Sequence, residues 1–347
     1  MNQSVQSHGS IPYAEARALG IDPSSILDFS ATVNPFPLPP SVQAMFSPEG
    51  IAAYPDTDSF EARQAIAAYH NIPAAWTLLC AGLTELIYLM PLVYTRAVYF
   101  SPSYGDYATA FARHWRPITA VSFPKSNEDF GGTVDSLCAI PFELLMVCNP
   151  NNPTGDYLPP DRIGELCKRF GQAIICIDES YQEMGENCDS ALHLIGRFHN
   201  LLILKSLTKP FGVGGLRAGY AVSSPVVVER LRRYLTPWGV SSIAQRIVPP
   251  LMAYVPFFKR QWADILIQKQ DMMRAISRQG FTVASKKCPF FLVKTGAAEG
   301  IRQRLLTEHH IAVRSCASFG MPEWIRIMPG RPEHNGVLLE ALRTVCR

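Results

Sequence analysis

One lysine stands out in the stretch from 206 to 220, SLTKPFGVGGLRAGY, because Lys209 lies among glycines and apolar residues with no acidic residue beside it. Burying an unpaired ammonium costs free energy, so most lysines lie at the surface. A desolvated lysine is also a better nucleophile, because burial favours the neutral amine. The setting of Lys209 therefore suggests a chemical role in which it is not a free ammonium.

Polar residues follow three apolar runs that have the character of buried strands. Asp178 ends the run AIICID and Tyr181 follows in DESY; ELLMVC leads into NPNNPTG, which contains Asn152, and LLILKS leads into the segment of Lys209. Ligands of a parallel sheet bind beyond the carboxyl ends of its strands. An amide, a carboxylate, a phenol and an amine are therefore predicted to converge at one edge of one sheet.

The elements that must position these residues are short apolar runs between about 96 and 222, alternating with helical segments such as PPDRIGELCKRFG. This alternation predicts an α/β domain with a mainly parallel sheet covered by helices on both faces. Asp58 and Glu61 have capping-box spacing and predict a helix over 59–70. Long helical patterns after 240, with a kink at Pro249 and Pro250, and then short strands predict a smaller α+β domain. The expected division is an extended arm over 1–40, a large domain over 41–240 and a small domain over 241–347.

The composition of the 347 residues excludes several functional classes. A formal net charge of +3, spread without charge runs, gives no nucleic-acid footprint. The N-terminus lacks a signal-peptide pattern and no apolar stretch reaches about 18 residues, so we expect a cytoplasmic protein without membrane contact. Nine cysteines without a C-x-x-C pair are expected to be reduced core residues, and the histidine spacing gives no metal site.

The joint pattern N-P-T-G at 152–155, D-x-x-Y at 178–181, S-x-x-K at 206–209 and an arginine eight residues after the lysine resembles the fold-type I pyridoxal-phosphate enzymes of the aspartate aminotransferase superfamily. The resemblance covers nearly the whole chain. It implies that Lys209 holds pyridoxal 5'-phosphate as a Schiff base and that Asp178 pairs with the protonated pyridine nitrogen. It also implies that Tyr181 and Asn152 hydrogen-bond the phenolate oxygen of the cofactor ring.

The same resemblance assigns the remaining cofactor contacts and an oligomeric state. Leu83 and Thr84 would meet the phosphate at a helix N-terminus, and Tyr104 would stack on the pyridine ring. Tyr54 matches a tyrosine that reaches the phosphate of a neighbouring subunit, which implies a homodimer with shared active sites. Hydroxyls and a guanidinium for the phosphate would come from Ser206, Thr208 and Arg217.

Two subfamilies match the rest of the chain: histidinol-phosphate aminotransferase and the threonine-phosphate decarboxylase of cobalamin synthesis. The segments SHGS, LDFSATVNP and RSCASF resemble motifs of the decarboxylase. They would place His8, Thr32 and Arg314 at the substrate phosphate and Arg326 at a second anionic group, with Asn152 also near the substrate. Arg331 is a further candidate anion ligand.

Three positions depart from the decarboxylase motifs: Ser10 replaces a glycine, Thr32 an asparagine and Ser315 an aspartate. The shorter Thr32 side chain suggests a changed substrate. The expected reaction is decarboxylation of threonine phosphate to aminopropanol phosphate, or of serine phosphate to ethanolamine phosphate, in corrinoid synthesis. The alternative is transamination of histidinol phosphate with 2-oxoglutarate, and a non-catalytic cofactor-binding scaffold is the third reading.

Overall fold

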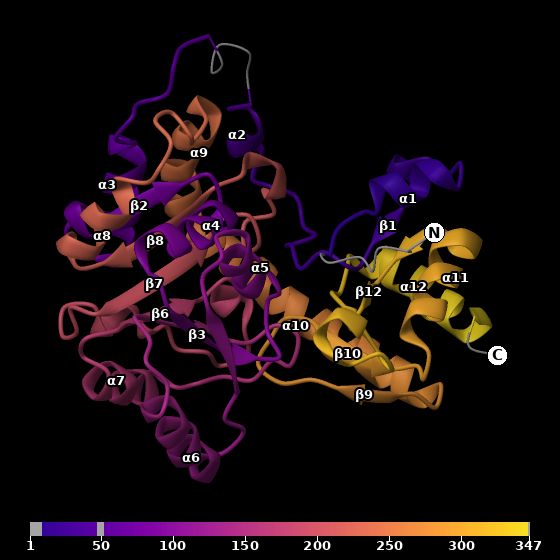
Figure 1. Cartoon of the computed structure of the whole chain (residues 1–347). Helices are drawn as coiled ribbons and strands as arrows, with labels where there is room; N and C mark the ends of the chain where they lie inside the picture. The colour runs from indigo at the N-terminus through magenta and orange to yellow at the C-terminus, as the bar shows by residue number, and fades with distance from the viewer. Residues whose placement is uncertain (1–8, 47–51, 346–347) are drawn as a thin grey trace.

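A seven-stranded sheet forms the centre of the large domain in the computed structural model, which describes residues 9–46 and 52–345 (Figure 1). Its order is β2-β8-β7-β6-β5-β3-β4. Neighbours from β7 to β4 run parallel, whereas β8 is antiparallel to both β7 and β2. The predicted mainly parallel sheet is confirmed. The strands are β2 (Thr77–Cys80), β3 (Ala97–Ser101), β4 (Ile118–Ser122), β5 (Leu144–Cys148), β6 (Ile174–Asp178), β7 (Leu201–Ser206) and β8 (Gly219–Ser223).

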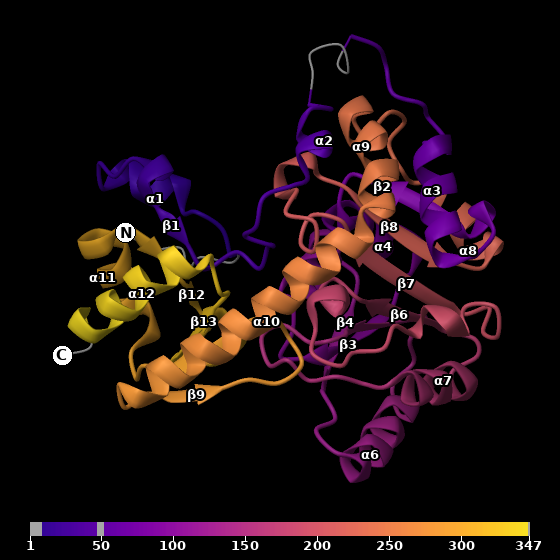
Figure 2. The ribbon, with the colours of Figure 1, turned by 180° about the vertical axis from the view of Figure 1, so that it is seen from behind.

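Helices cover the sheet on both faces, as the two opposite views show (Figures 1 and 2). Every residue of β5 and of β7 is buried, because a parallel strand covered on both sides has no solvent face. This burial explains why these strands are continuous apolar runs in the sequence. The helices of this domain are α2 (Pro40–Gln43), α3 (Phe60–His70), α4 (Leu83–Val93), α5 (Asp106–Arg113), α6 (Asn127–Cys138), α7 (Pro160–Arg169), α8 (Pro225–Arg232) and α9 (Ser242–Ala253).

A second, antiparallel sheet of order β12-β13-β10-β9 builds the small domain. The 24-residue helix α10 runs from the large domain to this sheet (Figure 2). Its side chains up to Ile265 belong to the large core, whereas Met272 and Ile276 belong to the second core. The change of core therefore falls within α10, later than the expected boundary at 240. The elements are α10 (Val255–Arg278), β9 (Thr282–Ala284), β10 (Phe291–Lys294), α11 (Ala298–His309), β11 (Ile311–Ala312), β12 (Arg314–Ser315), β13 (Trp324–Ile327) and α12 (Pro332–Val345).

The N-terminal segment is built into both domains. Helix α1 (Tyr13–Ala18) is tied to the small domain by an ion pair of 2.8 Å between Glu15 and Arg302, and β1 (Leu27–Asp28) pairs in parallel with β11. Further along, the backbone N–H of Asn34 donates to the carbonyl of Lys209 at 2.8 Å. The expected arm thus passes directly beside the lysine segment.

The start of α3 differs from the predicted capping box. Ser59 precedes the helix in a left-handed conformation with φ of 51° and without a side-chain cap. The carboxylate of Asp56 accepts from the N–H of Phe60 at 2.8 Å, whereas Asp58 forms an ion pair with Arg63 at 2.6 Å. The capping-box prediction is wrong because the arginine one turn into α3 attracts the expected cap residue.

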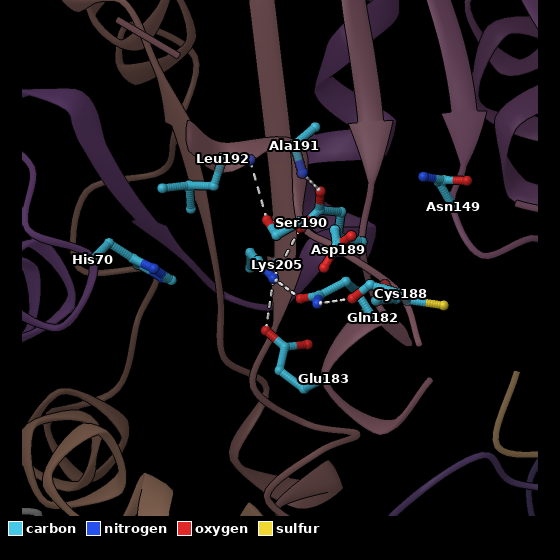
Figure 3. A network of polar contacts seen from close by, with 12 residues as sticks. His70, Asn149, Gln182, Glu183, Cys188, Asp189, Ser190, Ala191, Leu192 and Lys205 are labelled. Atoms are coloured by element: carbon cyan, nitrogen blue, oxygen red, sulfur yellow. Dashed lines mark hydrogen bonds and ion pairs between the residues drawn. The ribbon is translucent and has the colours of Figure 1, made fainter. Parts of the chain in front are cut away.

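A buried ion cluster around Lys205 connects β7 to the segment that follows β6 (Figure 3). The ammonium of Lys205 lies 2.9 Å from Glu179 and 2.8 Å from Glu183. Burial lowers the pKa of Lys205, but the two carboxylates raise it by more, so the net pKa lies above its usual range. Glu179 also accepts from the N–H of Ala191 at 2.8 Å. Because Glu179 follows Asp178 and Lys205 precedes Ser206, the cluster fixes the ends of the two strands.

We predict that Lys205→Met lowers the free energy of unfolding by about 3 to 5 kcal/mol, because it leaves the fully buried Glu179 without its cation. Urea denaturation measures the change. The control is Lys259→Met. Lys259 lines a cavity together with Lys205 but is exposed, so this variant should change stability by less than about 0.5 kcal/mol. Equal small effects of the two variants would contradict a role for the cluster in stability.

Candidate active site

A cavity of about 590 Å³ lies at the carboxyl ends of the strands, between the large domain, the small domain and the N-terminal segment. It gathers most of the residues predicted from the sequence, although these come from segments up to nearly 300 residues apart. Those that line it are Thr32, Leu83, Thr84, Tyr104, Asn152, Asp178, Tyr181, Ser206, Thr208, Lys209, Arg217, Arg314 and Arg326.

Lys209 lies in this cavity with Tyr181 and Asp178 beside it. Its ammonium is 4.3 Å from the centroid of the Tyr181 ring. Burial lowers the pKa of Lys209, but Tyr181 and then Asp178 raise it by more, so the net pKa is above its ordinary value. In the protein alone the charged form of Lys209 is stabilised, because the acidic partner that the local sequence lacks is supplied by the neighbouring strand, and the attachment of a cofactor to Lys209 stays a prediction.

The carboxylate of Asp178 is 4% exposed and is held from both sides. Its Oδ1 accepts from the backbone N–H of Ser180 at 3.0 Å, and its Oδ2 accepts from the hydroxyl of Tyr107 at 2.8 Å. Sequence reasoning missed Tyr107. Tyr104 lies in the turn before α5 and Tyr107 in its first turn, with ring centroids 5.7 Å apart, and the closeness of the two tyrosines in SYGDY was the available signal.

The other end of the cavity is formed by the start of α4 and the segment that follows β7. Leu83 and Thr84 open α4, whose first N–H groups and helix dipole favour an anion. A Cβ on Gly82 would lie 2.8 Å from Nη2 of Arg217, and Gly82 has φ of 84°, so only glycine lets this guanidinium approach. The hydroxyls of Ser206 and Thr208 lie 2.7 Å apart and complete a cradle for a phosphate.

Two buried arginines face the cavity from the small domain. Arg314 and Arg326 are directly opposite each other on the antiparallel strands β12 and β13, and they are 1% and 4% exposed. Burial and the neighbouring Arg326 lower the pKa of Arg314 to about 10. Like charges in this register repel each other, so the pair is suited to an anion between the two groups.

Arg326 connects the three parts of the site. It donates from Nη1 to Asn152 Oδ1 at 2.5 Å and from Nη2 to the carbonyl of Ser30 at 2.8 Å. Its Nε and the hydroxyl of Thr32 are buried without a hydrogen-bond partner within the described chain. Two unsatisfied polar groups in the wall of one cavity indicate a polar ligand. A Cβ on Gly9 would lie 2.7 Å from the same guanidinium, which shows how closely the N-terminal segment covers it.

Several sequence-predicted residues are not brought into the cavity. Tyr54 is 86% exposed and packs on Trp238 with ring centroids 5.5 Å apart, and Arg331 forms an ion pair of 3.5 Å with Glu333. Arg331 does not line the cavity, and a role for it as an anion ligand stays a prediction. His8 lies outside the described residues, so its role stays a prediction, as does a contact of Tyr54 with a second subunit.

Sequence reasoning also missed residues that hold the lysine segment from behind. The carbonyl of Pro210 accepts from the side-chain amide of Asn34 at 3.0 Å and from the indole N–H of Trp262 at 2.7 Å. Asn34 in turn donates to Gln261 at 2.8 Å. These contacts join the N-terminal segment, the lysine loop and α10, and they cannot be read from any one stretch of sequence.

Two searches of the described residues gave negative results. No group of three histidine, cysteine, aspartate or glutamate side chains within residues 9–46 and 52–345 is arranged to hold a metal ion. In the same part of the chain, no helix has the length and apolar character needed to cross a membrane.

Comparisons with known proteins agree with this geometry. A histidinol-phosphate aminotransferase from Ralstonia nicotianae is 28% identical over 344 residues, covering 95% of this chain and 91% of the relative. A threonine-phosphate decarboxylase from Salmonella typhimurium is 29% identical over 353 residues, covering 98% and 96%. The crystal structure of histidinol-phosphate aminotransferase from Sinorhizobium meliloti in complex with pyridoxal 5'-phosphate superposes with a TM-score of 0.87, at 22% identity, over 97% of this chain and 94% of that one.

Histidinol-phosphate aminotransferases recur among the similar proteins, at 26% to 28% identity. They favour the alternative reading over the decarboxylation expected first. The family model for class I and II aminotransferases matches residues 24–342, nearly the whole chain. The protein therefore belongs to the class I and II aminotransferase family, the fold-type I enzymes whose cofactor is pyridoxal 5'-phosphate.

Proposed function

We propose that this chain catalyses a reaction at the α-carbon of a small phosphorylated amine. One observation carries the proposal: a single cavity is lined by the amine of Lys209, with a carboxylate and a phenol beside it, and by two buried arginines of the small domain. The first group suits the cofactor and the second suits an anionic substrate. The cavity is lined by residues of both domains, so a cofactor and a substrate can contact each other within it.

The residues around Lys209 and at the start of α4 fit pyridoxal phosphate. The phosphate would occupy the cradle of α4, Ser206, Thr208 and Arg217, where Gly82 leaves room for the guanidinium. Lys209 would attach the aldehyde carbon, and Asp178 would hold the proton on the pyridine nitrogen. Contacts to the ring would come from Tyr104 on its face and from Tyr181 and Asn152 at its phenolate oxygen. When bound, the cofactor withdraws electrons from the bond that breaks at the α-carbon.

The protein's own groups divide the remaining work. Lys209 would move a proton at the substrate's α-carbon as general base, since its amine is buried in the cavity next to two groups that stabilise its charged form. Arg314 and Arg326 would bind the phosphate and a carboxylate. Residues of the segments 9–13 and 28–33 line the cavity and would help to keep water from the bound substrate.

Transamination is the reaction that the similar proteins support best. The proposed amino donor is histidinol phosphate, as the names of the recurring relatives suggest, and the acceptor that we propose for it is 2-oxoglutarate. In this reading one arginine pair serves two substrates in turn: it binds the phosphate of the first and a carboxylate of the second. A site with two adjacent guanidiniums matches both demands.

Decarboxylation of a phosphorylated amino acid is the second candidate, and a specific observation favours it. The segments that resemble the decarboxylase motifs all meet at one place: Gly9, Ser30 and Thr32 lie at or beside the guanidinium of Arg326 or in the same cavity wall. A substrate that carries both a phosphate and an α-carboxylate would engage both arginines at once. The relative from Salmonella typhimurium matches over this whole region.

A homodimer remains part of the proposal. Tyr54 and Trp238 form an exposed aromatic pair, at 86% and 53% exposure, on the large domain. Burial against a second copy would remove this apolar surface from water and would let Tyr54 reach a neighbouring phosphate, as the family resemblance implies.

The reaction is tested with purified protein and pyridoxal phosphate. We expect glutamate, without carbon dioxide, from histidinol phosphate plus 2-oxoglutarate; Lys209→Ala should abolish it. Carbon dioxide from threonine phosphate or serine phosphate, with no glutamate from histidinol phosphate, would replace transamination by the second candidate. Neither product from any of these substrates would contradict the proposed substrate class.

Removing one arginine should weaken substrate binding. We predict that Arg314→Gln raises the KM for the phosphorylated substrate by about 10-fold to 100-fold, because a hydrogen-bonded charge is worth about 1.5 to 3 kcal/mol. Steady-state kinetics at fixed cofactor concentration measures the change. Arg331→Gln is the matched control, since Arg331 pairs with Glu333 and does not line the cavity. The KM of this variant should equal that of the unmodified protein.

The cofactor cradle can be tested without substrate. We predict that Gly82→Ala weakens pyridoxal phosphate binding by about tenfold or more, because the new methyl group must displace Arg217 and the backbone must keep a positive φ. Absorbance titration of the cofactor-free protein gives the dissociation constant. Gly300→Ala, in α11 with nothing within 4 Å of the new Cβ, is the control and should bind normally. Equal cofactor affinities of the two variants would contradict a role for Arg217 in binding the phosphate.

A further inference from the structure

We propose that Tyr107 is a positioning residue that sets the orientation and the effective charge of Asp178 toward the pyridine nitrogen of the cofactor. The inference concerns the family's cofactor and rests on neither of the two candidate reactions. It starts from a contact that the sequence did not predict: the Tyr107 hydroxyl donates to Asp178 Oδ2 at 2.8 Å.

This hydrogen bond fixes the carboxylate completely. Oδ1 already accepts from the backbone N–H of Ser180 at 3.0 Å, so each oxygen of Asp178 has one donor within the protein. Tyr107 is fully buried and Asp178 is 4% exposed. With both oxygens held, the carboxylate plane cannot rotate, and the lone pair left for the pyridinium N–H keeps one direction.

The same tyrosine also touches the predicted stacking residue. Its ring lies edge-on to that of Tyr104, with centroids 5.7 Å apart at 88°, and close to that of Tyr99, with centroids 6.5 Å apart at 70°. All three rings are carried by β3, α5 or the turn between them. Tyr107 thus links the group at the edge of the cofactor ring to the group on its face.

The phenol acts as a donor at every working pH. Burial raises the pKa of Tyr107 well above its usual range, and the charge of Asp178 raises it further. The proton therefore stays on the phenol, which draws negative charge from the carboxylate. A carboxylate that shares its charge in this way stabilises a pyridinium less strongly than one without the bond.

Few other groups near Asp178 can change charge. The thiols of Cys148 and Cys176 are fully buried, and burial raises the pKa of each, so both stay neutral; burial likewise raises the pKa of Tyr181. The charged neighbour is the ammonium of Lys209, which becomes the cofactor attachment point. A shift seen on changing Tyr107 can therefore be assigned to the carboxylate.

The test is a pH titration of the visible absorption band of the lysine-bound cofactor in Tyr107→Phe. We expect the apparent pKa obtained from this titration to rise by about half a unit to one unit, because losing one hydrogen bond concentrates negative charge on Asp178. Tyr99→Phe is the matched control: it removes a hydroxyl from the same ring cluster and should leave the pKa unchanged.

A second variant covers the case in which Tyr107→Phe folds poorly. Replacing Tyr107 by 3-fluorotyrosine keeps its shape and makes the hydroxyl a stronger donor, so the apparent pKa should fall. An unchanged apparent pKa in both variants would overturn the proposal, and so would a lower apparent pKa in Tyr107→Phe. Either result counts even if the thermal stability of the variant is lower. Because no substrate is needed, these outcomes are independent of whether the enzyme transaminates or decarboxylates.

Discussion

The structure depends on two opposite charges in one cavity at the ends of two parallel strands: the ammonium of Lys209 and the carboxylate of Asp178, which helps to raise the pKa of that ammonium. Neither charge is stable in a protein interior without the other and without hydrogen bonds. Tyr107 and Ser180 supply the bonds to the carboxylate, and Asn34 and Trp262 hold the backbone next to the lysine. Much of the large domain can be understood as the support that keeps these two groups at one edge of the sheet.

A second constraint acts from the other side of the cavity. Arg314 and Arg326 repel each other across two strands, and an anion bound between them would relieve this repulsion. Since the arginines belong to the small domain and Lys209 to the large one, the proposed substrate would contact both domains. The N-terminal segment also connects the two domains, because it pairs with β11 and bonds the carbonyl of Lys209.

Sequence patterns predicted the sheet well where burial is uniform. The runs that became β3, β5, β6, β7 and β8 are apolar because both faces of the central sheet are covered, and the carboxyl ends of β5, β6 and β7 predicted which residues meet in the cavity. The edge strand β4 was missed because three of its five residues, Thr119, Ala120 and Ser122, are exposed and weaken the apolar signal, and TLLC of β2 was too short to recognise. Tyr107 and Asn34 were missed for another reason: their roles exist only through partners 71 and 176 residues away.

The central claim is a covalent bond between position 209 and the aldehyde of pyridoxal phosphate, and peptide mapping after borohydride reduction tests it most directly. The loaded protein would be reduced, digested and analysed by mass spectrometry. We predict one phosphopyridoxyl group per chain, located on the peptide that contains Lys209. A label on another lysine, or no label after incubation with excess cofactor, would contradict the assignment of this cavity as the active site.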